Sequence, residues 1–259
     1  MKFPDKEYIK ENINENGYFI AKNFINENQY KLIRDEAINY FENKLIQKNN
    51  LPKALRGGVK AGMKDVLGYT SNENWKILRG CYFNWNRNTN DLSEIIKVSR
   101  KISSFRNEII GLLPNYGSFI ESDNYIQYSS LSLYPNNGGF LKKHSDGHSY
   151  ENKLDLLHFK VELTHKNKDY NEGGFYFWDK IGNEICISSQ INPGDVLFFN
   201  GSLNHEIKPI KGKLGRIGLF EIPTYIEDES RLNEYSDMGE SKNLFAKIKN
   251  KVKSNLKIN

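Results

Sequence analysis

The amino-acid sequence predicts a mainly β protein in which helices precede a jelly roll of eight short strands. Three observations lead to this prediction. Apolar residues recur every three to four positions in two long segments before residue 114. From residue 124 onward, apolar and polar residues alternate instead, and turn residues separate short segments of this kind. Eight such strands can form two facing sheets that leave an opening for a ligand.

The first part of the chain, residues 5–48, is predicted to form a helix, a short strand and a second helix. Residues 17–24 read GYFIAKNF, which suits the strand, and Asn26 is a candidate N-cap for the helix that follows. Residues 91–113 carry apolar side chains at helical spacing and are followed by Pro114, which predicts a third helix.

Residues 49–72 lack a clear period between these helices. A polar loop of this length is uncommon in a compact domain unless it is functional or disordered. We consider two interpretations: a lid over the active site, with Lys53, Arg56 or Lys60 meeting substrate charge, or an ordinary solvated loop. The basic residues 241–259 form an amphipathic pattern, which fits a helix that packs on its own domain, lies on a membrane or binds a partner.

Alternating patterns and turns predict the eight strands of the jelly roll. They cover residues 125–134, 144–146, 154–164, 175–178, 184–188, 196–199, 205–210 and 217–225. With 38% hydrophobic residues in 259, we expect one domain over 1–259. Its parts are a helical N-terminal part (1–123, with the lid loop 49–72), the jelly-roll core (124–228) and a basic C-terminal helix or tail (229–259).

Composition also limits the cellular location and the binding partners that we expect for the chain. The chain has 37 basic and 32 acidic residues, and this net charge of +5 does not by itself predict a nucleic-acid partner. Its two cysteines, Cys81 and Cys186, are far apart and form no CxxC pattern, which favours a reducing compartment. The N-terminus lacks an apolar signal core, and no run reaches the roughly 18 apolar residues of a membrane span. We therefore expect a cytoplasmic protein without a transmembrane segment.

Two candidate metal ligands, His144 and Asp146, stand one residue apart after a predicted turn. In an extended segment, residues i and i+2 point to the same face, so an imidazole and a carboxylate can reach one ion. His205 follows another predicted turn and the apolar run at 196–199, and it is the third candidate. Two imidazoles and one carboxylate on one side of an ion are the arrangement that non-haem Fe(II) oxygenases use.

Arg216 lies eleven residues after His205, at the start of an apolar run over residues 217–222. If the two residues begin neighbouring antiparallel strands, both side chains can line one cavity. A guanidinium in that place suits a dicarboxylate, because its planar fork binds a carboxylate in bidentate fashion and stays charged at any working pH. For His158 and His165, which lie within or just after a predicted strand, we expect packing or surface roles.

These residues resemble those of the Fe(II)- and 2-oxoglutarate-dependent dioxygenases, most closely the prolyl-4-hydroxylase-like and phytanoyl-CoA-dioxygenase-like branches. The resemblance covers about residues 127–225. In chain order it rests on Tyr134-Pro135 with Gly138 and Gly139, His144-x-Asp146, Gly173-Gly174, Pro193-Gly194-Asp195, and His205 with Arg216.

The resemblance implies a double-stranded β-helix core, cupin-like, buttressed by the N-terminal helices. It implies that His144, Asp146 and His205 hold Fe(II), that Arg216 binds the distal carboxylate of the cosubstrate 2-oxoglutarate, and that Tyr134 hydrogen-bonds the same molecule, with O2 as second cosubstrate. The chain departs from the family in one place. Many members carry Ser or Thr two residues after the arginine, where this chain has Gly218.

The function implied is hydroxylation of an unactivated C–H bond in a small molecule, such as an amino acid or a biosynthetic intermediate, with succinate and CO2 as co-products. Asp146 favours hydroxylation over halogenation, because related halogenases carry a small residue there. Two alternatives stay open. One is an oxygenase that modifies a protein side chain or nucleic acid, and the other is a non-catalytic jelly-roll module that holds a different metal.

Overall fold

The computed structural model describes residues 5–49, 68–71, 73–83, 92–118, 121, 125–146 and 157–225. The N-terminal part contains α1 (Lys6–Asn16), β1 (Tyr18–Ala21), α2 (Glu27–Asn49), β2 (Gly68–Ser71), β3 (Trp75–Phe83) and α4 (Ser93–Ile109). The remainder contains β4 (Tyr125–Tyr134), β5 (Asn137–His144), β6 (Leu157–Glu162), β7 (Tyr170–Trp178), β8 (Glu184–Cys186), the short 3-10 helix η2 (Ile187–Ser189), β9 (Val196–Asn200), β10 (His205–Gly212) and β11 (Arg216–Tyr225).

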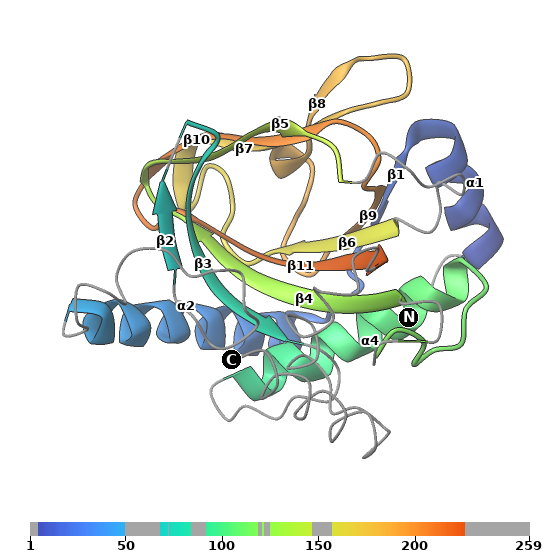
Figure 1. The fold of residues 1–259 in the computed structure, drawn as a ribbon, viewed down its shortest axis with the longest axis horizontal. Helices are drawn as coiled ribbons and strands as arrows, with labels where there is room; N and C mark the ends of the chain where they lie inside the picture. Colours follow the sequence, from blue (N-terminus) through green and yellow to red (C-terminus); the bar gives the residue numbers. More distant parts are fainter. Residues whose placement is uncertain are drawn as a thin grey trace, which may run out of the picture.

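The strands form two layers of antiparallel pairs, as a jelly roll requires (Figure 1). One layer runs in the order β1-β9-β6-β11-β4, and the other in the order β5-β10-β7-β8. Strand β3 joins them, because its first residues pair with β5 and its later residues pair with β4, while β2 pairs along its other edge. The predicted mainly β class with a jelly-roll core is thereby confirmed.

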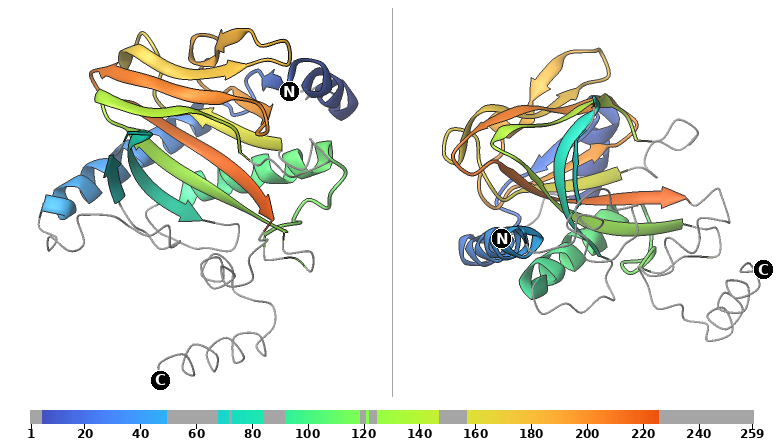
Figure 2. Two further views of the ribbon diagram at one scale, coloured as in Figure 1. Left: turned by 45° about the horizontal axis from the view of Figure 1, so that its top comes forward. Right: turned by 60° about the vertical axis from the view of Figure 1, so that its left-hand side comes forward.

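Helices α2 and α4 lie against the outer face of the layer that contains β6, β11 and β4 (Figures 1 and 2). Apolar side chains of both helices and of that outer face form one hydrophobic core. A second, smaller core lies between the two layers. Burial of apolar surface on both faces of one layer is the main stabilising term of such an arrangement.

Strand β6 shows how its sequence serves both cores. Leu157, Phe159 and Val161 point outward and pack under the helices. The alternate residues His158, Lys160 and Glu162 therefore point inward, between the two layers, and all three are buried. A strand that alternates apolar and polar residues normally turns its polar side to water. Here it turns that side into the interior.

The short strand β1 anchors the N-terminal segment to the sheet. It pairs with β9, with Tyr18 opposite Phe199. Gly17, between α1 and β1, has a φ of +85°, and a Cβ there would lie 2.3 Å from Cδ1 of Leu203. Glycine is therefore required at this turn, both for its backbone conformation and for the close contact.

Several boundaries differ from those predicted. Of the expected strand at 144–146, only His144 is in a strand: it ends β5, which begins at Asn137, because backbone pairing with β10 extends through the glycines after Pro135, and Asp146 lies in the loop that follows. Residues 68–71 of the expected lid loop form β2, which pairs with β3. Strand β3 itself was not predicted. Asn49 of the expected loop ends α2, and residues 50–67 and 72, including Lys53, Arg56 and Lys60, lie outside the described residues, as does the C-terminal tail 229–259. No described helix is both long and apolar enough to cross a membrane.

Candidate metal centre

The two candidate histidine ligands face each other across neighbouring strands. His144 is the last residue of β5 and His205 the first residue of β10, and the antiparallel register places them opposite each other. Opposed residues of an antiparallel pair carry their side chains on the same face of the sheet. The two ring centroids accordingly lie 4.3 Å apart.

Backbone carbonyls orient both imidazole rings. Nδ1 of His144 lies 2.8 Å from the carbonyl oxygen of Lys142, and Nδ1 of His205 lies 2.9 Å from that of Leu203. Because a carbonyl oxygen only accepts, each Nδ1 carries a proton, which leaves Nε2 as the nitrogen available to a metal ion. Burial and the neighbouring His205 lower the pKa of His144, which favours the neutral form that binds metals.

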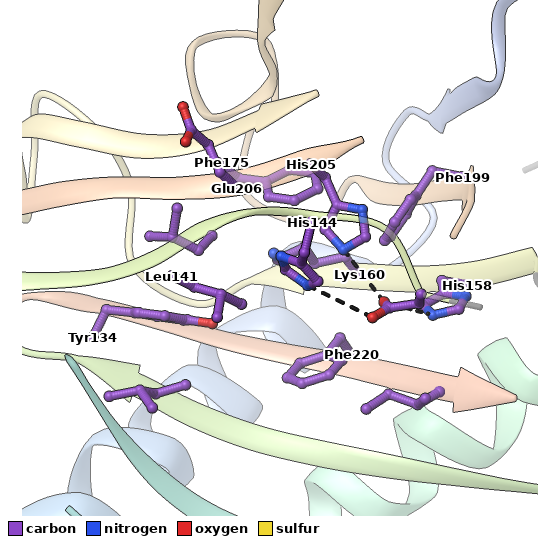
Figure 3. A pocket seen from close by; sticks show the side chains of 14 residues that line it. Tyr134, Leu141, His144, His158, Lys160, Phe175, Phe199, His205, Glu206 and Phe220 are labelled. Atoms are coloured by element: carbon purple, nitrogen blue, oxygen red, sulfur yellow. Dashed lines mark ion pairs between the residues drawn. The ribbon is translucent and has the colours of Figure 1, made fainter. Parts of the chain in front are cut away.

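Asp146 completes the group from the loop after β5 (Figure 3). Its backbone N–H donates to the carbonyl oxygen of Gly201, 2.8 Å away, in the turn before β10. One carboxylate oxygen lies 3.6 Å from Nε2 of His144, and the other lies 3.3 Å from Nε2 of His205. The ligand atoms of the three residues all lie within 4.8 Å of one another. This set of two nitrogens and one oxygen fits Fe(II) with other coordination positions left open.

A third imidazole, that of His158, contacts Asp146 from β6. Its Nε2 lies 3.2 Å from a carboxylate oxygen of Asp146, and the ring is buried beside Gly201, where a Cβ would lie 2.3 Å from Cε1 of His158. Burial alone would raise the pKa of Asp146, but His158 and His205 outweigh it and hold that pKa well below its ordinary value. His158 is thus part of the candidate metal centre's surroundings, a position that its strand context did not indicate.

A cavity of about 240 Å³ opens beside these residues, between the two layers. This is somewhat below the roughly 300–1,000 Å³ of typical ligand pockets and suits a small ligand. Figure 3 shows the candidate ligands at one side of it and Tyr134 at the other. The rest of the lining is mostly apolar: Ile77, Leu141, Phe175, Phe199, Ile207, Phe220 and Ile222, with Lys160 and Glu206.

Arg216 lies behind this cavity. Its Nη2 donates to Oε1 of Glu162 at 2.8 Å, and both side chains are 0% exposed. The guanidinium carbon lies 5.7 Å from the centre of the Tyr134 ring and 6.0 Å from that of the Phe175 ring, and these two rings line the cavity. Arg216 is not among the described residues that form the lining. Contact of Arg216 or Tyr134 with 2-oxoglutarate remains a prediction.

Gly218 leaves space beside the guanidinium of Arg216, which contacts Glu162. It follows Arg216 by two residues in β11, so both lie on the same face, and it pairs with Glu162 of β6. A Cβ at Gly218 would lie 3.3 Å from Nη1 of Arg216. The glycine that departs from the family pattern therefore makes room for an ion pair inside the protein.

Three donors surround the carboxylate of Glu162. Oε1 accepts from Arg216 and, at 2.6 Å, from Oγ of Ser188, and Oε2 accepts from Oη of Tyr170 at 3.2 Å. Burial would raise the pKa of Glu162, but Arg216 outweighs it, and the pKa is lowered. Burial would likewise lower the pKa of Arg216, but Glu162 outweighs it, and that pKa is raised. The two groups therefore form a charged pair.

Lys160 enters the cavity from the same face of β6. Its side chain is 6% exposed, and Nζ lies 3.6 Å from the centre of the Phe175 ring. Burial and the charge of Arg216 lower the pKa of Lys160 well below its ordinary value. Sequence analysis singled out neither Lys160 nor Glu162. The signal was present in LHFKVE, where three polar residues alternate with three apolar ones between the two halves of the candidate site.

No protein-family model and no curated protein matches the chain. Solved structures do. A prolyl hydroxylase from Trichoplax adhaerens, in complex with a peptide fragment of the hypoxia inducible factor oxygen degradation domain, matches with a TM-score of 0.55 at 14% identity, over 91% of this chain and 93% of that chain.

Two further structures match over most of their length. A Pseudomonas putida prolyl-4-hydroxylase has a TM-score of 0.51 at 12% identity, over 86% of this chain and 100% of that chain. AviO1 from Streptomyces viridochromogenes Tue57 has a TM-score of 0.53 at 11% identity, over 86% and 97%. The jelly roll of this chain, with its N-terminal helices and strands, is therefore the fold that prolyl hydroxylases share.

Proposed function

We propose that this chain is an Fe(II)- and 2-oxoglutarate-dependent dioxygenase that hydroxylates an unactivated C–H bond of a small molecule, such as an amino acid or a biosynthetic intermediate. Succinate and CO2 would be the co-products. The observation that carries the proposal is the convergence of His144, Asp146 and His205 at the edge of a cavity that contains a buried cation.

The three side chains fit the metal because of how they are held. Both Nε2 atoms face Asp146, since each Nδ1 donates to a backbone carbonyl. Asp146 is fixed by its own backbone hydrogen bond and by His158. Rigid orientation of ligands by their neighbours is what a metal site needs in order to bind one ion tightly.

Bound Fe(II) and 2-oxoglutarate would supply the reduction of O2 and the oxidation of the substrate C–H bond. The chain's own residues would bind and orient the substrate and 2-oxoglutarate and keep water out of the cavity. Tyr134, with Arg216 behind it, forms the side of the cavity away from the metal ligands and is our candidate contact for 2-oxoglutarate. Phe220 and Ile222 offer an apolar wall on β11, which suits an apolar part of the substrate and keeps water out.

The proposal is tested by adding Fe(II) and 2-oxoglutarate without oxygen and recording the visible charge-transfer band of the metal chelate. We expect the band in the unchanged protein and its loss in Asp146→Ala. Asp179→Ala is a matched control, since Asp179 sits in an exposed turn and bonds only to nearby residues. A band of equal strength in Asp146→Ala would contradict the ligand assignment.

Substrate class follows from a second measurement, in which O2 is admitted and succinate is measured against panels of metabolites, peptides and oligonucleotides. Succinate formed only with a metabolite supports the proposal. Succinate formed only with a peptide or an oligonucleotide would support an oxygenase of protein side chains or nucleic acid. A metal-binding module without catalysis would give no succinate with any member of the panels.

A further inference from the structure

Two buried cations stand near the cavity, and their surroundings differ. Arg216 has a dedicated counterion, Glu162, at 2.8 Å. Lys160 lines the cavity, and among the described residues no carboxylate oxygen lies within 4.0 Å of its Nζ. Its recorded contact is with the face of the Phe175 ring. A buried ammonium on an aromatic face is stabilised only in part, since cation–π attraction is weaker than a buried ion pair.

Neither nearby carboxylate is available to Lys160. Glu162 already accepts from Arg216, Ser188 and Tyr170. Asp146 faces the imidazoles of the candidate metal centre and would be a ligand of the ion. Because Arg216 and Glu162 neutralise each other, neither of these described carboxylates is left to balance an ammonium at Lys160.

We infer that Lys160, rather than Arg216, is the cation that pairs with the distal carboxylate of 2-oxoglutarate. This inference rests on the proposed function and deepens it, by naming the residue that selects a dicarboxylate. The incoming carboxylate supplies the counterion that Lys160 lacks. Arg216 acts as a positioning residue: with Glu162 it supports the wall formed by Tyr134 and Phe175.

Two features support this division of roles. Gly218 leaves room for the guanidinium of Arg216 to contact Glu162, and Arg216 is not among the described residues that line the cavity. Burial and Arg216 lower the pKa of Lys160, and an anion bound beside it would act in the opposite direction by favouring the charged ammonium. Binding a carboxylate would therefore supply the counterion that an ammonium at Lys160 lacks in the ligand-free cavity.

The test compares two 2-oxo acids by calorimetric titration of the protein loaded with Mn(II), a redox-inert substitute for Fe(II). 2-Oxoglutarate has the distal carboxylate, and 2-oxopentanoate ends in a methyl group instead. A charge-assisted contact is worth roughly 10- to 100-fold in affinity. We expect the unchanged protein to prefer 2-oxoglutarate by that factor and Lys160→Met to lose the preference, with little change in its affinity for 2-oxopentanoate.

Two variants serve as controls. Lys160→Arg keeps a cation and should keep most of the preference. Lys208→Met removes a lysine that also lies over a ring, 4.0 Å from the centre of Tyr176, but on the surface, and should behave as the unchanged protein. An unfolding curve for Lys160→Met verifies that it is folded.

The outcomes separate the two proposals. If Lys160→Met binds Mn(II) normally and still prefers 2-oxoglutarate by the original factor, the role of Lys160 is overturned and the proposed function stands. If the unchanged protein, loaded with metal, binds neither 2-oxo acid, the proposed function fails and the role of Lys160 fails with it.

Discussion

The Glu162–Arg216 pair makes an asymmetric prediction about stability. Both side chains are 0% exposed and 2.8 Å apart, so removal of either leaves a buried charge. Glu162→Gln leaves Arg216, which cannot lose its proton, buried without its counterion. Removal of one partner of a buried pair costs about 3–5 kcal/mol, and we expect Glu162→Gln to reach this range.

The reverse change is expected to cost less. In Arg216→Met, the Glu162 carboxylate keeps its hydrogen bonds from Ser188 and Tyr170, and it can also take up a proton. Remaining hydrogen bonds and protonation should limit the cost to about 1–3 kcal/mol. For a chain of this size, each kcal/mol corresponds to a change of roughly 2–4 °C in Tm.

Equilibrium urea unfolding of the metal-free protein at pH 7.5, followed by circular dichroism, measures both values. Glu172→Gln is the matched control, because Glu172 pairs with Lys211 at 2.7 Å but both side chains are more than half exposed, and such a pair contributes roughly 1 kcal/mol or less. The reasoning is refuted if Arg216→Met is as destabilising as Glu162→Gln, or if Glu162→Gln resembles the surface control.

Three more predictions follow from the same contacts. His158→Phe should weaken Mn(II) binding roughly 10- to 100-fold in a calorimetric titration, because Asp146 loses the imidazole that orients it, and unchanged affinity would exclude that role. Lys160→Met should raise the free energy of unfolding of the ligand-free protein by about 1–4 kcal/mol. The pKa of Lys160 is lowered in the folded state, so below the ordinary value of 10.5 the unfolded chain binds more protons than the folded one. The stability advantage of Lys160→Met, measured by urea unfolding across pH, should therefore shrink as pH rises toward 10.5. An advantage that grows with pH would contradict the burial argument. Gly218→Ser should displace the guanidinium and lower the free energy of unfolding by about 1–3 kcal/mol, whereas no change would show that the contact at 3.3 Å relaxes freely.

Strands could be predicted where alternation ended in strong turn signals. The predicted range 125–134 coincides with β4, and 205–210 and 217–225 lie within β10 and β11. Strand β3 could not be found in this way. Its sequence WKILRGCYF has no clear alternation, and it is a strand because β2 pairs along one of its edges and β5 and β4 pair along the other. Tertiary pairing of this kind outweighs local preference.

The candidate ligands could be found from the sequence because His144-x-Asp146, a weak signal alone, is accompanied by His205 and Arg216 after predicted turns. The roles of the two buried basic residues, Arg216 and Lys160, could not be predicted in the same way. The partner of Arg216 depends on the register between β6 and β11, which places Glu162 opposite Gly218. The direction in which Lys160 points depends on which face of β6 the helices cover. Neither the register nor the covered face can be deduced from a single strand.

The hydrogen bond from Asp146 to Gly201 joins the loop after β5 to the turn before β10, where His205 begins. An ion bound there would link the loop after β5 to the start of β10, two segments about sixty residues apart at the end of the β5–β10 pairing. Its binding energy would therefore add to the unfolding free energy of the whole barrel, by about 2.7 kcal/mol at a hundred times Kd. Amide protons of β5 and β10 would report occupancy through slower exchange, so metal loading could be followed without any turnover.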